Sequence, residues 1–134
     1  MLQSWRWFGP GDPLSLREIR QAGVTDIVTS LHHLECGDVW PDAEIARRIR
    51  EVEWDETRQR ASGLRWSVVE SLPIHEDIKT RTGDFQHYID VYKANVLRLG
   101  AQGVRTICYN FIPVLDWART DLNIEQADGS TISG

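Results

Sequence analysis

A weak internal repeat of about forty residues constrains the fold of this chain more than any other feature of its sequence. Gly23, Gly63 and Gly103 each precede a short run rich in β-branched and apolar residues. Each glycine also follows a helical pattern, where a residue with positive φ commonly closes the last turn. The repeating unit is therefore a helix, a glycine and a strand, and such regular self-similarity indicates a repeated supersecondary module.

Four strands are expected, at residues 2–7, 26–30, 65–70 and 104–110. Helical segments separate them, and tight turns lead into the second and third strands. Strict alternation of strand and helix predicts a parallel sheet with right-handed crossovers. The sequence thus predicts an α/β fold with about three βα units and a fourth parallel strand.

Three helices are predicted between these strands. The first begins with Asp12 as N-cap and Pro13 at the first helical position. The second begins near Pro41, and the third ends at Gly100. Their expected apolar faces are Leu14, Ile19 and Ala22; Ile45, Ile49 and Val52; and Phe85, Tyr88, Ile89, Tyr92, Val96 and Leu99, while Arg47, Glu51, Glu56 and Arg60 form a solvated, charged face on the second helix.

Long polar loops follow the predicted strands, whereas most turns that lead into strands are short. In parallel α/β folds the functional site lies at the carboxyl ends of the strands, within such loops. The segment from residue 111 to 134 lacks a helical stripe and carries a hairpin signal at Asp128-Gly129, so we expect a loop and hairpin flap over this edge. The polar residues expected there are His32, His33, Glu70, His75, Glu76, Asp77, Tyr109, Asn110 and Asp116.

The two adjacent histidines allow more than one interpretation. Side chains alternate along an extended segment, so at most one of His32 and His33 is expected to reach a ligand. His33 and Cys36 have the spacing of half a metal site, but a pair without matching ligands is weak evidence for a metal.

Glu70 and the segment after it also have structural alternatives. A carboxylate at the end of an apolar strand is costly unless it is paired or useful, and Arg6, on a first strand expected to neighbour that of Glu70, is a possible ion-pair partner. The segment that begins at His75 could be a solvated turn in which Asp77 caps the following helix. Tyr109 and Asn110 are candidates for recognising substrate hydroxyl groups.

Composition and charge exclude several classes of protein. Fifteen basic and twenty acidic residues give a net charge of −5, with the two signs interleaved along the chain. A nucleic acid or an anionic membrane would need a basic patch, so neither partner is expected. Cys36 and Cys108 occupy very different settings, and the sequence shows no signal peptide and no long apolar run. We therefore expect a cytoplasmic protein.

Four strings of this sequence closely resemble the mannonate dehydratase family. They are SWRWFGP at 4–10, LHH at 31–33, WSVVESLPIHEDIK at 66–79 and CYNFIPVLDW at 108–117. The resemblance implies the N-terminal part of a TIM (β/α)8 barrel of the xylose-isomerase-like group. It also implies a lyase of carbohydrate metabolism that converts D-mannonate to 2-keto-3-deoxy-D-gluconate and water in glucuronate catabolism.

The same resemblance implies a divalent metal, manganese first and iron as the alternative. The family's metal ligands and its acid–base groups lie in later strands, so no residue of this chain inherits a metal or catalytic role, and Cys108 is not the metal-binding cysteine. Substrate-pocket membership carries over to His32, Glu70, His75, Tyr109 and Asn110.

Length sets the last expectation. A closed barrel needs roughly 250 residues, and this chain has 134. We therefore expect a single incomplete barrel domain over 1–134, a fragment that is inactive alone and whose parent enzyme is a homo-oligomer. The alternative is a non-catalytic half-barrel that assembles with itself or complements another chain, because its open sheet edges favour association.

Overall fold

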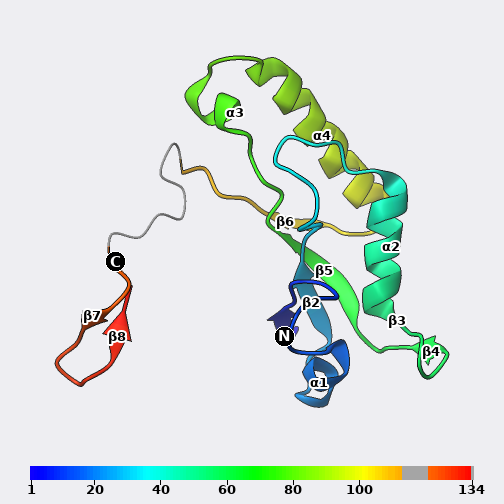
Figure 1. Cartoon of the computed structure of the whole chain (residues 1–134). Coiled ribbons are helices and arrows are strands. Elements are labelled where there is room, and N and C mark those ends of the chain that lie inside the picture. The colour runs from blue at the N-terminus through cyan, green and yellow to red at the C-terminus, as the bar shows by residue number, and fades with distance from the viewer. Residues whose placement is uncertain (113–120, 134) are drawn as a thin grey trace.

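A four-stranded parallel sheet forms the centre of the computed structural model, which describes residues 1–112 and 121–133. The strands are β1 (Ser4–Arg6), β2 (Asp26–Thr29), β5 (Arg65–Glu70) and β6 (Thr106–Cys108). They lie in chain order, and every neighbouring pair is parallel (Figure 1). The predicted parallel sheet is therefore confirmed, with β1 and β6 shorter than expected.

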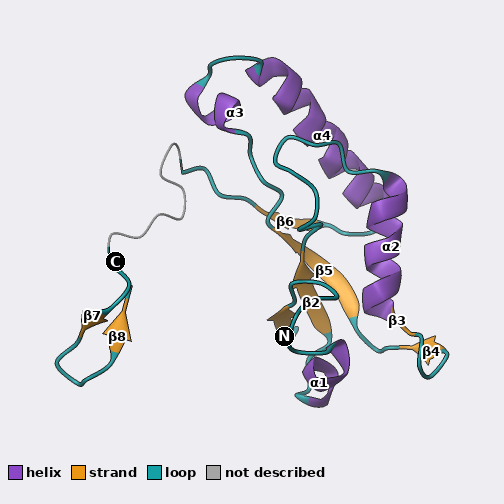
Figure 2. Ribbon diagram, viewed as in Figure 1, coloured by secondary structure: helices purple, strands orange, loops and turns teal. Residues whose placement is uncertain are grey.

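Helices connect these strands along the chain. They are α1 (Leu16–Gln21), α2 (Asp42–Glu53), the short α3 (Glu76–Thr80) and α4 (Phe85–Ala101). Figure 2 shows α2 and α4 along the same side of the strands. Within the described residues, no helix is long and apolar enough to cross a membrane.

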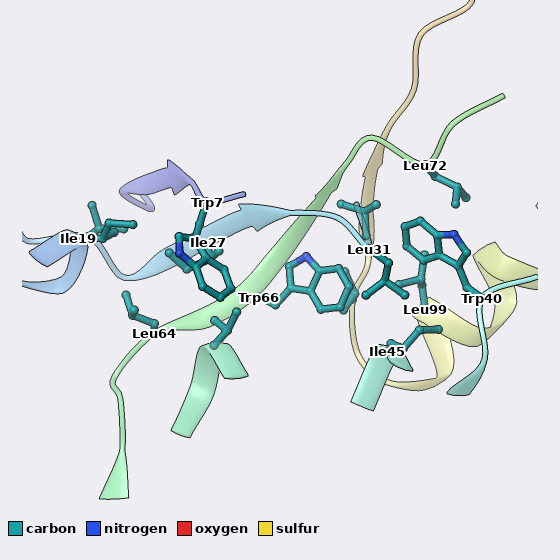
Figure 3. Close-up of a cluster of buried hydrophobic side chains, with 14 residues drawn as sticks. Trp7, Ile19, Ile27, Leu31, Trp40, Ile45, Leu64, Trp66, Leu72 and Leu99 are labelled. Carbon is teal, nitrogen blue, oxygen red and sulfur yellow. The ribbon is translucent and has the colours of Figure 1, made fainter. Parts of the chain in front are cut away.

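The hydrophobic core lies between the helices and one face of the sheet (Figure 3). Ile27 and Val69 of the sheet and Ile45 and Val52 of α2 are all 0% exposed. The register places a different set of residues on the opposite face, and these are exposed or half-buried: Arg6, Val28, Val68, Glu70, Thr106 and Cys108. The described part of the chain therefore leaves the second face of the sheet open.

The first helix begins later than predicted. Its N-cap is Ser15, which forms a capping box with Glu18, a reciprocal arrangement that satisfies two backbone N–H groups. The Asp12 carboxylate instead accepts hydrogen bonds from the backbone N–H groups of Phe8, at 2.7 Å, and Leu14, at 2.9 Å. Asp12 thus closes the loop after β1 and leaves the helix to start at the next available cap.

The second helix ends earlier than predicted. It stops at Glu53, and a small antiparallel hairpin follows, formed by β3 (Trp54–Asp55) and β4 (Arg60–Ala61). Glu56 and Arg60 therefore do not belong to its charged face, because Asp55 accepts a hydrogen bond from the Arg58 backbone and turns the chain. The expected Arg47–Glu51 ion pair does form on the helix, at 3.9 Å.

The long helix α4 continues one residue past Gly100, and the backbone turns at Gly103, which has a φ of +93°. Its buried residues are Val91, Asn95 and Leu99, so the inward face is rotated from the predicted stripe and includes an amide. The Asn95 side chain accepts a hydrogen bond from Trp40 N, at 2.8 Å, and donates one to the backbone carbonyl oxygen of residue 38, at 2.9 Å.

The C-terminal hairpin predicted at Asp128-Gly129 is confirmed. Strands β7 (Ile124–Glu125) and β8 (Thr131–Ile132) pair antiparallel, and Gly129 has a φ of +82° in the turn. Asp116 lies outside the described residues. That this segment forms a flap over the edge of the sheet stays a prediction.

Candidate functional site

The carboxyl ends of the parallel strands bring together the loops that the sequence marked as functional. His32 follows β2, Glu70 ends β5, and Tyr109 and Asn110 follow β6. His75 begins α3, shortly after β5. All five candidate residues therefore lie at one edge of the sheet, as predicted, and their contacts divide them into four local groups.

Glu70 forms an ion pair with Arg6. The Arg6 Nη1 and Glu70 Oε1 atoms are 3.1 Å apart, and both side chains remain partly exposed. The first strand does not neighbour β5, contrary to expectation, because β2 lies between them. The ion pair therefore reaches across β2 on the open face of the sheet. It lies at the carboxyl edge of the sheet.

His32 and His33 have different partners. The His32 ring lies against Phe8, with ring centroids 5.6 Å apart. Burial lowers the pKa of His32, and the positive charges of Arg48 and Arg6 lower it further, so the neutral imidazole is favoured. His33 Nε2 instead lies 2.8 Å from Glu44 Oε2 of α2. The two rings thus have different partners, and His32 is the one that contacts Phe8 of the first loop.

His75 is held by its own helix and by a ring from α4. It is the N-cap of α3, and its Nδ1 atom accepts a hydrogen bond from Asp77 N at 3.2 Å. Its ring stacks on Tyr88, with centroids 3.5 Å apart and planes 10° apart. Because Nδ1 acts as acceptor, a neutral ring carries its proton on Nε2. His75 thus takes the capping role considered for Asp77, whose carboxylate accepts a hydrogen bond from Asp84 N at 3.1 Å.

Tyr109 and Asn110 lie just beyond β6. Tyr109 is 60% exposed and Asn110 is half-buried. Tyr109 lies close enough to α4 to influence Tyr92, whose pKa is raised first by burial and then by Tyr109. The backbone N–H of Leu72 donates to Cys108 O at 3.2 Å, which joins the segment that leads to His75 to the end of β6.

Arg48 is a buried residue that the sequence reasoning missed. It is 4% exposed on α2, and its guanidinium carbon lies 5.3 Å from the centre of the Trp7 ring. A Cβ atom added at Gly9 would meet its Nη1 atom at 2.6 Å. One signal could have identified it: Arg48 occupies the helical face of Ile45 and Val52, three and four residues away, where apolar side chains are expected.

No metal centre is assembled by residues 1–112 and 121–133, since they contain no group of three or more His, Cys, Asp or Glu side chains placed to hold an ion. The side chains at this edge are suited to recognition by hydrogen bonding. The edge provides a carboxylate and guanidinium pair, a neutral imidazole, a fixed N–H donor and a phenol, which together suit a polar small molecule rich in hydroxyl groups.

Comparison with known proteins gives consistent matches. A model of the protein family described as D-mannonate dehydratase (UxuA) matches residues 1–134. A mannonate dehydratase from Marinomonas sp. (strain MWYL1) is 53% identical over 130 residues, and one from Saccharophagus degradans is 51% identical over 130 residues. Each alignment covers 97% of this chain but only 32% and 31% of those proteins.

A solved structure shares the fold. The crystal structure of mannonate dehydratase from Streptococcus suis serotype 2 matches with a TM-score of 0.83 and 39% sequence identity. That match covers 99% of this chain and 36% of the solved one. The chain therefore spans about a third of the length of the relatives that it resembles.

Proposed function

Because this chain belongs to the D-mannonate dehydratase family, we propose that it is part of a lyase that converts D-mannonate to 2-keto-3-deoxy-D-gluconate and water. The observation that carries this proposal is the identity of about half of all aligned positions across nearly the whole chain. The gathering of its polar candidate residues at the carboxyl edge of a parallel sheet supports it, because enzymes of this architecture react substrates there.

The proposal includes a fold that this chain only begins. We infer that the parallel sheet is the first part of a (β/α)8 barrel, whose remaining strands pair with the outer edges of β1 and β6. The open face of the sheet supports this inference, since the inward face of a barrel is covered by side chains from the opposite strands. The residues on that face, such as Val28 and Val68, would then pack in the barrel interior.

The candidate residues are proposed to bind the sugar acid. Glu70, held by Arg6, would accept hydrogen bonds from substrate hydroxyl groups. His75 would donate from Nε2, because its Nδ1 is occupied by Asp77 N. His32, Tyr109 and Asn110 would complete the recognition of the remaining hydroxyl groups. Such interactions give selectivity, because a hydroxyl group missing from a wrong substrate leaves a polar group unpaired.

The proposed reaction depends on a divalent metal, Mn²⁺ or Fe²⁺, which would stabilise the charge that develops beside the substrate carboxylate. The described residues do not fit such a metal, because they provide no ligand group. We therefore propose that its ligands, together with the acid and base of the reaction, lie in later strands of the family's barrel. The parent enzyme is proposed to be cytoplasmic and homo-oligomeric.

A second candidate is a half-barrel that associates without catalysis. The open sheet face favours it, because an uncovered face and two unpaired strand edges promote association. Size-exclusion chromatography with light scattering tests this candidate. A concentration-dependent dimer without turnover would support it, whereas a monomer at all concentrations would exclude self-association.

Complementation tests the proposed function directly. Two preparations would be compared. The first is the chain alone, and the second is the chain mixed with a shortened Marinomonas relative that lacks the 130 residues matched by this chain. With Mn²⁺ and D-mannonate, we expect 2-keto-3-deoxy-D-gluconate only from the combination. Turnover by the chain alone, with stoichiometric manganese, would show that the ligand assignment is wrong. A stable complex without any turnover would contradict the proposed reaction.

A further inference from the structure

A pocket of about 380 Å³ lies between helix α2 and the loops that follow β1 and β2. Phe8 and Pro10 line it from the first loop, and His32 lines it from the second. Arg48 and Glu51 line it from the helix. It opens at the same edge of the sheet as the proposed substrate site and shares only His32 with the residues assigned to that site.

Arg48 forms the buried wall of this pocket. Its side chain is 5% exposed, and within the described residues its Nη1 atom has no hydrogen-bond partner. Its Nε atom lies 3.2 Å from Glu51 Oε2, an ion pair that lacks the alignment of a hydrogen bond. Buried guanidinium groups normally use most of their donors. Arg48 therefore carries buried N–H groups that the described residues leave unpaired.

The charges around the pocket are also unbalanced. Glu51 is shared, because Arg47 Nε lies 3.9 Å from its other carboxylate oxygen. Burial lowers the pKa of Arg48, and Glu51 offsets this only in part. The charge of Arg48 in turn helps to lower the pKa of His32. His32 thus experiences a positive potential in this pocket, which favours a bound anion.

We propose that this pocket binds a small carboxylate anion, with the guanidinium of Arg48 facing the carboxylate and the ring of His32 beside it. A planar carboxylate matches the paired N–H groups of a guanidinium. A doubly charged phosphate is disfavoured, because Glu51 lies on the same wall. Phe8 and Pro10 offer apolar surface for the carbon chain, and the volume lies at the lower end of the range for small-molecule sites.

This inference rests on the proposed function only through His32, which both sites would use. The pocket adds a carboxylate site beside the helix α2, away from the open face of the sheet where Glu70 and Arg6 lie. It requires no metal and no turnover, so its binding can be measured on the chain itself.

The test follows the imidazole resonances of His32 by NMR in the isotope-labelled chain at constant ionic strength. The probes are acetate, D-gluconate and the neutral polyol D-glucitol. We expect saturable shifts of the His32 resonances with acetate and D-gluconate, and none with D-glucitol. Unchanged resonances with both carboxylates would overturn the proposal, and equal shifts with D-glucitol would show that the carboxylate is not recognised.

Three variants locate the site. Arg48→Met should weaken D-gluconate binding about tenfold or more, the usual loss for a charged hydrogen-bonding partner. Arg50→Met is the matched control, because Arg50 is an exposed residue of the same helix that pairs with Glu56. The affinity of this variant for D-gluconate should be unchanged. Glu51→Gln removes the competing carboxylate and should tighten binding, which keeps the test decisive should Arg48→Met fail to fold.

Equal affinity in Arg48→Met, or weaker binding in Glu51→Gln, would overturn the proposal. The outcomes also separate it from the proposed function. If Arg48→Met loses carboxylate binding but keeps mannonate turnover in the complemented enzyme, the pocket is a site separate from the proposed substrate site. Absence of mannonate turnover with intact carboxylate binding would remove the proposed function alone.

Discussion

The imidazole of His75 lies flat on the phenol ring of Tyr88, with centroids 3.5 Å apart and planes 10° apart. Gly37, in the loop after β2, approaches both rings: an added Cβ atom would lie 2.7 Å from Tyr88 Cε1 and 3.0 Å from His75 Cδ2. Three segments distant in sequence thus meet at one point. Because Gly37 has no side chain, the Tyr88 ring of α4 can stack on the ring of His75, the N-cap of α3.

We predict that Gly37→Ala destabilises the chain by about 1–3 kcal/mol, because Gly37 has a φ of +93° and its new Cβ atom would displace the stacked rings. Urea denaturation followed by tryptophan fluorescence measures this loss. Gly11→Ala is the matched control, because Gly11 has no atom within 4 Å of an added Cβ. A free energy of unfolding equal to that of the control would contradict the argument.

Asn95→Ala tests the buried amide of α4. The substitution leaves Trp40 N and the backbone carbonyl oxygen of residue 38 without their hydrogen-bond partner, and we expect a loss of about 2–4 kcal/mol in the free energy of unfolding. Leu97→Ala is the control on the same helix, because Leu97 is 74% exposed and should cost about 0.5 kcal/mol or less. Similar losses in the two variants would show that the amide bridge contributes little.

The sequence predicted the sheet better than the helix boundaries. A glycine every forty residues and the alternation of strand and helix were sufficient to predict four parallel strands, but they did not predict that β2 separates β1 from β5. The end of α2 was wrong because the charge pattern continues through Glu56 and Arg60, although the turn at Asp55 has already begun. The start of α1 was wrong because Asp12 and Ser15 are both good caps, and only Ser15 has a glutamate three residues later.

The sequence also predicted the candidate site only in part. The resemblance to the mannonate dehydratase family is confirmed by the family match over residues 1–134, and strand ends alone placed the candidate residues at one edge. Arg48 and Asn95 were missed because each is a polar residue at an apolar helical position. Their structural roles depend on contacts with residues far away in sequence, such as Trp7 for Arg48 and Trp40 for Asn95. The periodicity of the sequence does not reveal such contacts.

The Arg6–Glu70 pair provides a test of function separate from stability. Both side chains are partly exposed, at 44% and 37%, and such pairs contribute about 1 kcal/mol or less to stability. Glu70→Gln should therefore fold normally. In the complemented enzyme it should lower kcat/KM for D-mannonate about tenfold or more, because the uncharged amide is a weaker acceptor for hydroxyl groups.

Glu56→Gln is the matched control for this experiment. Glu56 also pairs with an arginine, Arg50, at 2.7 Å, but it lies in the β3–β4 turn. Its variant should change neither kcat/KM nor stability. Equal kcat/KM for the Glu70→Gln and unsubstituted enzymes would exclude Glu70 from the substrate site and leave its ion pair as a structural feature.

Asp26 gives a prediction for pH. This buried carboxylate accepts hydrogen bonds from Ser67 and, at 2.5 Å, from Thr25 Oγ1, and these bonds, Ser67 first, lower its pKa in the folded chain. A carboxyl group with a lowered folded pKa stabilises the fold above its unfolded pKa of about 3.9, and this contribution is lost as the pH falls through the folded value. The chain should therefore lose stability on acidification below about pH 4.

Asp26→Asn removes this titration. The difference in free energy of unfolding between the unsubstituted chain and the variant should be largest near neutral pH and should shrink below about pH 4, as Asp26 becomes protonated. Urea denaturation of both chains across pH 3–7 measures it, and Asp90→Asn, at an exposed position of α4, controls for the general loss of charge. A difference that stays constant, or that grows on acidification, would show that the ionised form of Asp26 does not stabilise the fold.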